Sequence, residues 1–379
     1  MCSIDLLGHS KIHVSQRKYR VSIELQQGSA SALFGYLADC IADFLATHGI
    51  KAEDGKIPLG FTFSFPVEQT AINRGRLLRW TKGFNCPDAI GQDVVELLQR
   101  SLDAKGVSVT VSALVNDTVG TLLANAYQCG GRSVLGGIFG TGTNGAYLET
   151  DVNVNGVAQS MVINTEWGGY DNERAALPIN PFDSAVDRCD IRPRTQAFEK
   201  MISGMYLGEI SRVVLVHLID RNELFNGYSS ARLNTPYAFL TEYMSAAEVQ
   251  GVPEVKKLLI GDVGVPAEHV SDADVETVRR VCRAVSTRAA RLSGTAIAAV
   301  LVRTGTFAWD GTSANDLPVV LGFDGSIIEH YPRFQERVLD ALRGIFGDAA
   351  SRIHITFVKD GSGVGAALGA LQAKKLGRQ

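Results

Sequence analysis

Strand-like and helix-like segments alternate along most of this 379-residue sequence, and this alternation constrains the fold more than any other feature. Apolar residues at spacings of three and four indicate helices, whereas short apolar or alternating runs indicate strands. The pattern predicts helices at 29–48, 93–102, 196–220, 272–302 and 333–345 and after Gly363. It predicts strands at 18–25, 57–65, 107–115, 133–139, 146–149, 318–323 and 352–358. This order favours an α/β fold in which helices cover a mixed or parallel sheet.

Composition excludes several classes of protein. With 45% hydrophobic and 20% charged residues, the sequence is typical of a soluble globular protein. A net charge of −3 argues against a broad basic face, and no apolar run approaches the roughly 20 residues of a membrane helix. We therefore expect neither nucleic acid nor a membrane as a partner. The ends show no secretory leader and no lipidation signal, which predicts a cytoplasmic protein.

The metal-binding residue types show no motif. The six cysteines are widely spaced, form no C-x-x-C pair and are expected to be reduced thiols. The seven histidines carry no zinc-type spacing, so we expect no metal held by protein side chains alone.

Two loops combine polar groups with aromatic residues. Ser64 stands where the predicted strand 57–65 leaves the sheet, and its hydroxyl is either functional or bonded to its own turn. Lys82 lies between Trp80 and Phe84, either as a functional cation or as a surface lysine whose stem covers apolar surface.

A carboxylate follows the predicted strand 107–115. Asp117 stands at the carboxyl end of this strand, where α/β folds bind ligands, and it could accept a proton from a hydroxyl group. Aspartate is also a good N-cap, so the same residue could simply begin the next helix. The spacing alone does not separate these two interpretations.

Glycines gather in the passage from Gly130 to Gly145, which holds seven of them. Such a loop lets backbone N–H groups approach a phosphate, although no G-K-[ST] follows as in a Walker loop. Gly140, Gly142 and Gly145 match the G-x-G-x-x-G spacing, but residues 146–149 look like a strand, so a β-hairpin is the alternative. A second passage of small residues at 359–367 opens a helix that either faces a nucleotide or is a plain turn with a cap.

Taken together, these passages resemble the eukaryotic hexokinase family, and most closely its fungal glucokinase branch. The matching segments occur in family order at 59–69, 80–84, 114–123, 138–147, 164–169, 196–209, 284–290, 321–326 and 360–367. The resemblance implies a two-domain actin-like ATPase fold with ribonuclease-H-like sheets and an interdomain cleft that closes on sugar. The small domain would hold 1–114 and 359–379, with sugar-binding loops and the C-terminal helix. The large domain, 115–358, would hold the catalytic aspartate, the second phosphate loop and the nucleotide-binding region.

The resemblance also implies a role for individual residues. Asp117 would be the general base for the sugar 6-hydroxyl, and Lys82 would stabilise charge on the transferred phosphoryl group. The sugar ligands would be Ser64, Thr81, Asn116, Asn144, Glu166 and Glu199. The second phosphate loop would be Gly140, Thr141 and Gly142, and further nucleotide contacts would be Gly204, Ser286, Gly361 and Ser362. The implied partners are glucose or a related hexose and ATP, with Mg²⁺ bound mainly through the ATP phosphates, in a monomer or weak homodimer.

One departure from the family pattern bears on activity. The family has a D-x-G-G-T-N phosphate loop ahead of all these segments, and this sequence has none. Residues 1–8 resemble the stretch just after that loop, which predicts an N-terminally truncated fold. Because such a loop directs N–H donors at developing charge, we expect weak or absent kinase activity. Two functions stay open: an ATP-dependent hexokinase acting at the first step of glycolysis, and a non-catalytic glucose-binding or regulatory protein derived from one.

Overall fold

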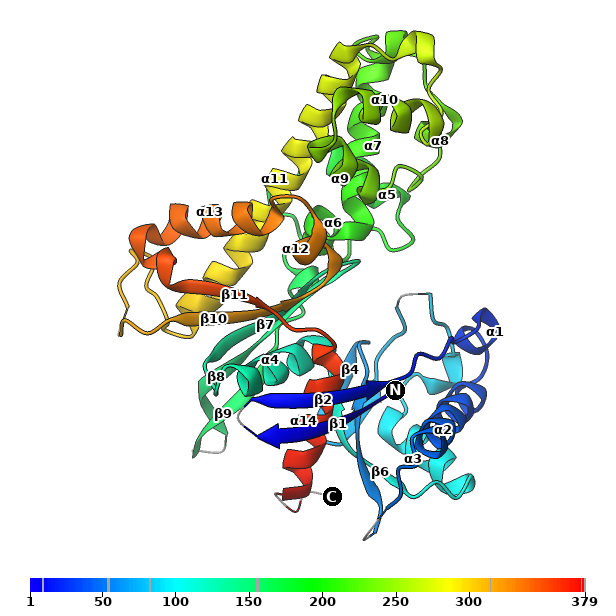
Figure 1. Cartoon of the computed structure of the whole chain (residues 1–379), viewed down its shortest axis with the longest axis vertical. Coiled ribbons are helices and arrows are strands. Elements are labelled where there is room, and N and C mark those ends of the chain that lie inside the picture. Colours follow the sequence, from blue (N-terminus) through cyan, green and yellow to red (C-terminus); the bar gives the residue numbers. More distant parts are fainter. Residues whose placement is uncertain are drawn as a thin grey trace. The chain divides into compact units, whose positions relative to one another are not determined.

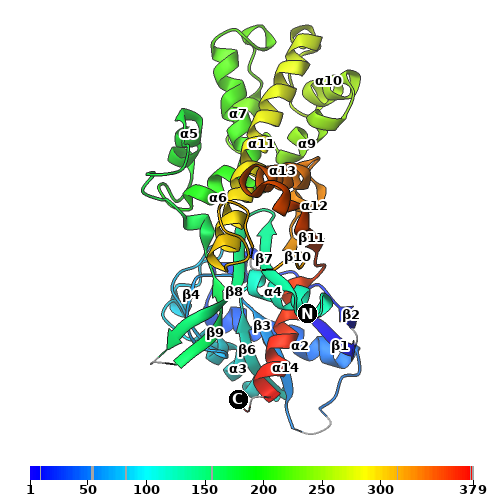
Figure 2. The same cartoon turned by 90° about the vertical axis from the view of Figure 1, so that its left-hand side faces the viewer.

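The computed structural model describes residues 1–8, 10–52, 55–81, 83–154, 157–313, 315–375 and 377, with the backbone alone at 151–154 and 157–159. The chain divides into two compact units (Figures 1 and 2). Unit 1 is Met1–Gly136 with Val358–Gln379, and unit 2 is Gly137–Phe357. The domain boundary expected at 114/115 differs from this division, because the helix after Asn116 packs with the last helix of unit 1.

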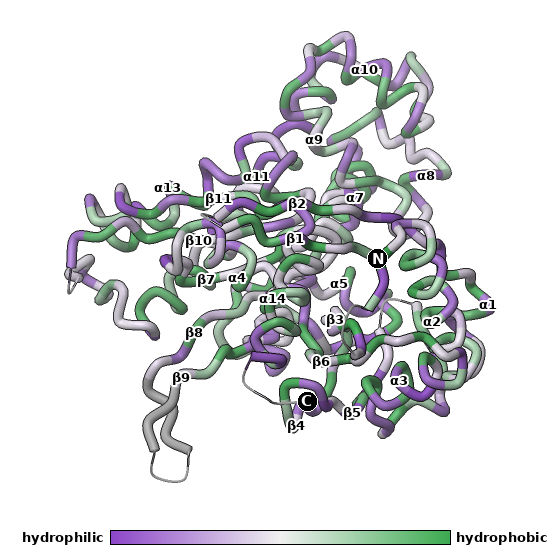
Figure 3. Tube along the Cα trace, turned by 60° about the horizontal axis from the view of Figure 1, so that its bottom comes forward, coloured by the Kyte–Doolittle hydropathy of each residue, from purple (hydrophilic) through white to green (hydrophobic). Residues whose placement is uncertain are grey.

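Unit 1 is built around two parallel strands, β3 (Ile57–Thr62) and β6 (Val109–Val115). Two amphipathic helices, α2 (Ala30–Thr47) and α3 (Val94–Ala104), supply much of its core, and both hydropathy colours occur along α3 in Figure 3. Hairpins β1 (Cys2–Gly8)/β2 (Lys11–Gln16) and β4 (Val67–Ala71)/β5 (Arg74–Leu77) complete its strands. Its short helices are α1 (Ile23–Gln26) and η1 (Pro87–Ala89).

The last helix, α14 (Gly361–Lys375), packs against β3, β6 and α4 (Asp117–Gln128). Glycine makes this close approach fit, since a Cβ on Gly365 would lie 2.0 Å from the carbonyl oxygen of Gly120. Unit 1 is therefore closed by a segment distant in sequence from its other elements.

One helix in the described part of the chain, α2, is long and apolar enough to cross a membrane by length and composition. This is weak evidence, since a core helix of a soluble protein passes the same test. Leu33, Phe34 and Ile41 of α2 belong to the core of unit 1.

Unit 2 carries most of a five-stranded sheet in the order β11-β10-β7-β8-β9. The strands are β7 (Ser133–Phe139), β8 (Thr143–Val154), β9 (Val157–Asn164), β10 (Val319–Asp324) and β11 (Ile353–Phe357). β10 and β11 are parallel, and β8 and β9 are antiparallel. In its core, the ring of Phe139 contacts the rings of Phe323 and Phe334.

The helices of unit 2 follow β9 and surround one long helix, α11 (Asp272–Arg303), drawn in yellow in Figure 1. The α-helices are α5 (Pro181–Cys189), α6 (Ala197–Ile202), α7 (Gly204–Asp220), α8 (Ala231–Asn234), α9 (Thr241–Val249), α10 (Val252–Gly261), α12 (Ser326–His330) and α13 (Phe334–Phe346). The short 3₁₀-helices are η2 (Trp167–Gly169), η3 (Phe225–Gly227), η4 (Ala267–His269) and η5 (Gly347–Arg352). α11 packs against α7, α9 and α13. It therefore links the helices that precede β10 to α13, which follows that strand.

The predicted α/β alternation is confirmed in most segments. The prediction of a strand at 18–25 is wrong, because Ser22 accepts a hydrogen bond from the Leu25 N–H and caps α1 there. The predicted helix at 196–220 is interrupted at Ser203, whose backbone is extended. This break turns the chain between α6 and α7, both of which contact the predicted site.

Candidate functional site

In unit 1, the predicted polar residues stand where parallel strands end. Thr62 of β3 pairs with Val115 of β6, so Ser64 and Asp117 both follow the carboxyl ends of neighbouring strands. The Phe63 N–H donates to the Val115 carbonyl oxygen at 2.9 Å, which continues the pairing toward Ser64. Carboxyl ends of parallel strands are the usual ligand-binding edge of α/β sheets.

The helix cap at this edge is Asn116 rather than Asp117. The Asn116 Oδ1 accepts the Thr118 N–H at 3.0 Å and the Thr118 hydroxyl at 2.7 Å. The half-buried Asp117 accepts the same N–H through Oδ1 at 2.9 Å, and its Oδ2 makes no hydrogen bond with any residue that the structure describes. One carboxylate oxygen of Asp117 is thus available to a substrate hydroxyl.

Aromatic rings attach the Thr81 loop to the Ser64 loop. Trp80 stacks on Phe84 with ring centroids 5.7 Å apart, and Phe65 meets the Trp80 ring edge-on at 4.8 Å. The Trp80 indole N–H also donates to the Cys86 carbonyl oxygen at 2.7 Å. Thr81 is therefore carried on a fixed loop beside Ser64, whereas Lys82 lies outside the described residues.

In unit 2, Asn144 and Glu166 are joined by a residue that the sequence analysis did not select, Asn164. The Asn144 amide donates to Asn164 Oδ1 at 2.7 Å, and both amides donate to Glu166 Oε1, at 3.1 and 2.8 Å. Glu166 adopts a left-handed backbone with φ of 50°, which is costly for a non-glycine residue and typical of functional sites. The sequence signal for Asn164 was its place at the start of the matching segment 164–169, in which no role was assigned to it.

Glu199 approaches the same turn from α6. Its Oε2 accepts the Thr143 N–H at 3.0 Å, and a Cβ on Gly142 would lie 2.7 Å from that oxygen. The Trp167 indole donates to the Thr143 hydroxyl at 2.9 Å and fixes the turn from the other side. Asn144, Glu166 and Glu199, three of the predicted sugar ligands, are thus brought together around residues 142–145.

The predicted phosphate loop is the turn between β7 and β8. The Gly140 N–H donates to the Gly142 carbonyl oxygen at 3.0 Å, so the hairpin-like alternative describes its backbone. The Gly204 N–H donates to the Gly140 carbonyl oxygen at 2.8 Å, and the Met205 N–H donates to that of Thr141 at 3.2 Å. Two of the predicted nucleotide segments are therefore in direct contact.

A pocket of about 370 Å³ opens beside this contact, within the size range of small-molecule sites. Its lining includes Thr141 and Gly204 as predicted. Its other lining residues were not predicted and come mainly from α9 and α12: Met205, Thr241, Glu242, Ser245, Ser326, Ile327, His330 and Tyr331.

Ser286 does not line that pocket but belongs to a buried group behind it. The Glu248 cluster, as we name it, consists of Glu248, Ser286, Tyr331 and Arg337. The Ser286 hydroxyl, fully buried, donates to Glu248 at 2.6 Å and accepts from Arg337 at 2.7 Å. The Tyr331 hydroxyl donates to Glu248 at 2.8 Å, and Arg337 pairs with Glu248 at 2.5 Å. Ser286 is thus placed to support the pocket wall through Tyr331, and a direct nucleotide contact stays a prediction.

Charge in the Glu248 cluster is balanced. Burial alone would raise the pKa of Glu248, but hydrogen bonds from Arg337, Ser286 and Tyr331 hold that pKa below its ordinary value. Burial and the Glu248 charge raise the pKa of the Tyr331 hydroxyl, which therefore stays protonated as a donor.

Gly361 and Ser362 begin α14 in unit 1. The Thr62 hydroxyl donates to the Ser362 carbonyl oxygen at 3.0 Å, and a Cβ on Gly120 would lie 2.8 Å from Ser362 Cα. These small residues allow close packing, and their nucleotide role stays a prediction. In the described part of the chain, no group of three or more His, Cys, Asp or Glu side chains could hold a metal ion. All six cysteines are free thiols.

Comparisons with known proteins give one consistent result. Two family models, both described as Hexokinase, match residues 134–372 and residues 1–127. A glucokinase of Aspergillus niger is 39% identical, with 99% of this chain and 83% of the relative aligned. Hexokinase-1 of Schizosaccharomyces pombe is 37% identical, with 99% and 77% aligned. The solved hexokinase from Schistosoma mansoni complexed with glucose has a TM-score of 0.84 at 37% identity, covering 98% of this chain and 82% of that one. The predicted fold class, the two-domain α/β fold of the actin-like ATPases, is confirmed.

Proposed function

We propose that this chain, which belongs to the hexokinase family, transfers the γ-phosphoryl group of ATP to the 6-hydroxyl of glucose. The observation that carries the proposal is Asp117, whose carboxylate stands at the end of β6 with Oδ2 available. The relatives named glucokinase and hexokinase, and the solved hexokinase with glucose, support hexose as the substrate class.

Asp117 would act as the general base. Its carboxylate takes the proton of the 6-hydroxyl as the sugar oxygen bonds to the γ-phosphorus, while the bond from that phosphorus to the ADP oxygen breaks. A positioned base of this kind contributes about 10²- to 10⁴-fold in rate. The backbone carrying Asp117 is rigid because the Asn116 side chain caps α4.

Amides and carboxylates would recognise the sugar. A hexose hydroxyl is both donor and acceptor, and the group of Asn144, Glu166 and Glu199 offers both roles. Ser64, Thr81 and Asn116 of unit 1 are proposed as further ligands, on the strength of the family resemblance and their place at one sheet edge. Such a polar site rejects analogues that lack a hydroxyl, because its groups would be left unpaired.

The pocket beside Gly140, Thr141 and Gly204 is proposed to hold ATP. Mg²⁺ bound mainly through the phosphates would supply neutralisation of the charge on the transferred group. Loop N–H groups near Gly142 would position the phosphates, whereas the Gly204 N–H is already bonded to the Gly140 carbonyl oxygen. The roles of Lys82, Ser286, Gly361 and Ser362 are carried by the family resemblance alone.

The test is glucose 6-phosphate formation by the 379-residue chain with Mg²⁺-ATP, beside Asp117→Ala. The absent D-x-G-G-T-N loop predicts weak turnover, and we expect that turnover to fall by about 10²- to 10⁴-fold in the variant, while both proteins bind glucose in calorimetric titration. Asp93→Asn is the matched control, since Asp93 also stands at a helix start in unit 1 but caps α3. Equal turnover in wild type and Asp117→Ala would refute the assignment of the base. Glucose binding without any turnover would instead support the non-catalytic sugar-binding alternative.

A further inference from the structure

The short helix α6 carries Glu199 but cannot hold its own position. It has six residues, whereas isolated helices below about 12–15 residues are marginal in water. Its N-cap, Gln196, has a left-handed backbone and makes no side-chain cap bond. The place of α6, and with it the Glu199 carboxylate, must therefore come from tertiary contacts.

Lys200, the next residue, makes several such contacts. Its ammonium donates to Asp187 Oδ1 at 2.8 Å and to the Arg192 carbonyl oxygen at 2.8 Å. It also lies 3.4 Å from Asp190 Oδ1, and the residue is only 6% exposed. A buried ammonium is tolerated only where its partners are in place, so Lys200 has one well-defined position.

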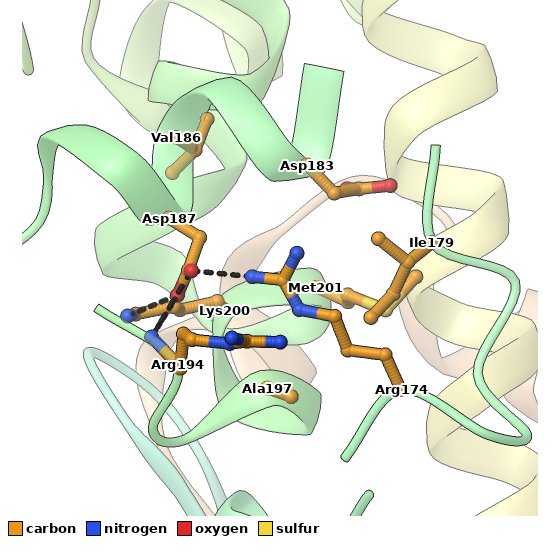
Figure 4. A pocket seen from close by; sticks show the side chains of 9 residues that line it. All are labelled: Arg174, Ile179, Asp183, Val186, Asp187, Arg194, Ala197, Lys200 and Met201. Atoms are coloured by element: carbon orange, nitrogen blue, oxygen red, sulfur yellow. Dashed lines mark hydrogen bonds and ion pairs between the residues drawn. The ribbon is translucent and has the colours of Figure 1, made fainter. Parts of the chain in front are cut away.

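Asp187 is itself held from several directions, as the dashed lines in Figure 4 show. Arg174 pairs with its Oδ2, and the Arg194 N–H donates to both of its oxygens at 3.0 Å. Burial alone would raise the pKa of Asp187, but the Lys200 and Arg194 hydrogen bonds hold that pKa below its ordinary value. The remaining cavity of about 20 Å³ is near the space of a single water molecule, so these groups have little room to rearrange.

We infer that Lys200 is a positioning residue: anchored on Asp187, it holds α6 so that the Glu199 carboxylate meets the Thr143 N–H. The inference rests on the proposed function insofar as Glu199 binds sugar. Only a small displacement of the Glu199 carboxylate can be tolerated, because its Oε2 lies 3.0 Å from the Thr143 nitrogen and directly against Gly142. A displacement of about 1 Å in such a group can cost on the order of a hundredfold in kcat/KM.

The first variant is Lys200→Met, which keeps the length of the stem and removes the ammonium. We expect the glucose KM and the glucose Kd to rise about tenfold, within the range of such displacements, while the KM for ATP stays unchanged. We also expect faster hydrogen exchange at the Thr143 amide, since its acceptor is displaced. This second readout needs neither sugar nor turnover.

The control is Arg212→Met, which breaks another buried ion pair of unit 2. Arg212 pairs with Glu209 at 2.6 Å within α7 and donates to the Leu233 carbonyl oxygen. The Arg212→Met variant should lower Tm without changing the glucose Kd or the hydrogen exchange rate of the Thr143 amide. If Lys200→Met also lowers only Tm, or if both variants change the glucose Kd alike, the inference is overturned.

A milder variant covers the case in which Lys200→Met does not fold. Asp187→Asn keeps the shape of the side chain and removes only its charge, and it should raise the glucose Kd and speed Thr143 exchange in the same direction. Unchanged exchange at Thr143 in folded Asp187→Asn would overturn the inference. A wild type without turnover would contradict the proposed function alone, because the exchange measurement would still decide the role of Lys200.

Discussion

Removing the arginine of the Glu248 cluster should destabilise unit 2 far more than removing an exposed arginine from the same helix. In Arg337→Met, the partners that Glu248 keeps among the described residues are the hydroxyls of Ser286 and Tyr331, although its side chain is 3% exposed. Leaving one member of a buried ion pair uncompensated costs about 3–5 kcal/mol. At about 2–4 °C per kcal/mol for a unit of this size, Tm should fall by about 6–20 °C.

The control is Arg343→Met, also on α13. Arg343 pairs with Asp340 at 2.5 Å, but both side chains are more than half exposed. An exposed pair contributes about 0.2–1 kcal/mol, so Tm should change by less than about 4 °C. Differential scanning calorimetry of both variants measures the difference. Equal shifts in the two variants would refute the reasoning that burial makes the Glu248 cluster strong.

The pH dependence of stability gives an independent check on the same cluster. The pKa of Glu248 is lower in the folded protein than in the unfolded chain. Its contribution is therefore complete above the ordinary glutamate pKa of about 4.3 and is lost as pH falls through the lower folded value. Wild type should lose stability over that acidic range, and Arg337→Met should lose less because part of the stabilisation is already gone. A steeper acid loss in the variant would contradict this account.

Three further predictions concern other parts of the chain. Gly365→Ala should destabilise unit 1 by about 1–3 kcal/mol in urea unfolding, because its Cβ would lie 2.0 Å from a backbone oxygen of α4. Gly344→Ala, with nothing within 4 Å of its Cβ, should be neutral or stabilising, and equal losses in both would contradict the packing argument. Asn164→Ala removes the 2.8 Å hydrogen bond to Glu166 and should weaken glucose binding by about 1 kcal/mol in calorimetric titration; unchanged binding would exclude this support. Burial and a neighbouring aspartate raise the pKa of Tyr206, so the native state keeps a proton that the unfolded chain releases. Stability should therefore fall as pH rises above about 10, and less so in Tyr206→Phe, whereas identical alkaline melting curves would contradict it.

The sequence predicted the elements well where apolar spacing was long and regular. It was wrong at 18–25, because alternating apolar residues suit a strand and a short capped helix equally, and the Ser22 side chain decides locally. It could not show the break at Ser203, because a one-residue interruption leaves the helical periodicity of both neighbours intact. Long-range contacts such as the approach of Gly365 to Gly120 leave no periodic signal at all.

The candidate site was likewise predicted only in part. Spacing placed Asp117 at a strand end but left its role open between cap and base, and only the geometry shows that Asn116 is the cap. Asn164 was missed although it opens the matching segment 164–169, because a single asparagine has no distinctive pattern. The resemblance assigned Ser286 to the nucleotide, but no sequence pattern could reveal that its hydroxyl forms hydrogen bonds with Glu248 and Arg337.

The closure of unit 1 by α14 has a consequence for the order of folding during synthesis. Domains generally fold as units, N-terminal first, as the chain leaves the ribosome. Unit 2 is one continuous stretch, Gly137–Phe357, and its residues emerge before α14 does. The faces of β3, β6 and α4 that α14 covers stay exposed through all of that time. The first-made unit is therefore the last to finish folding.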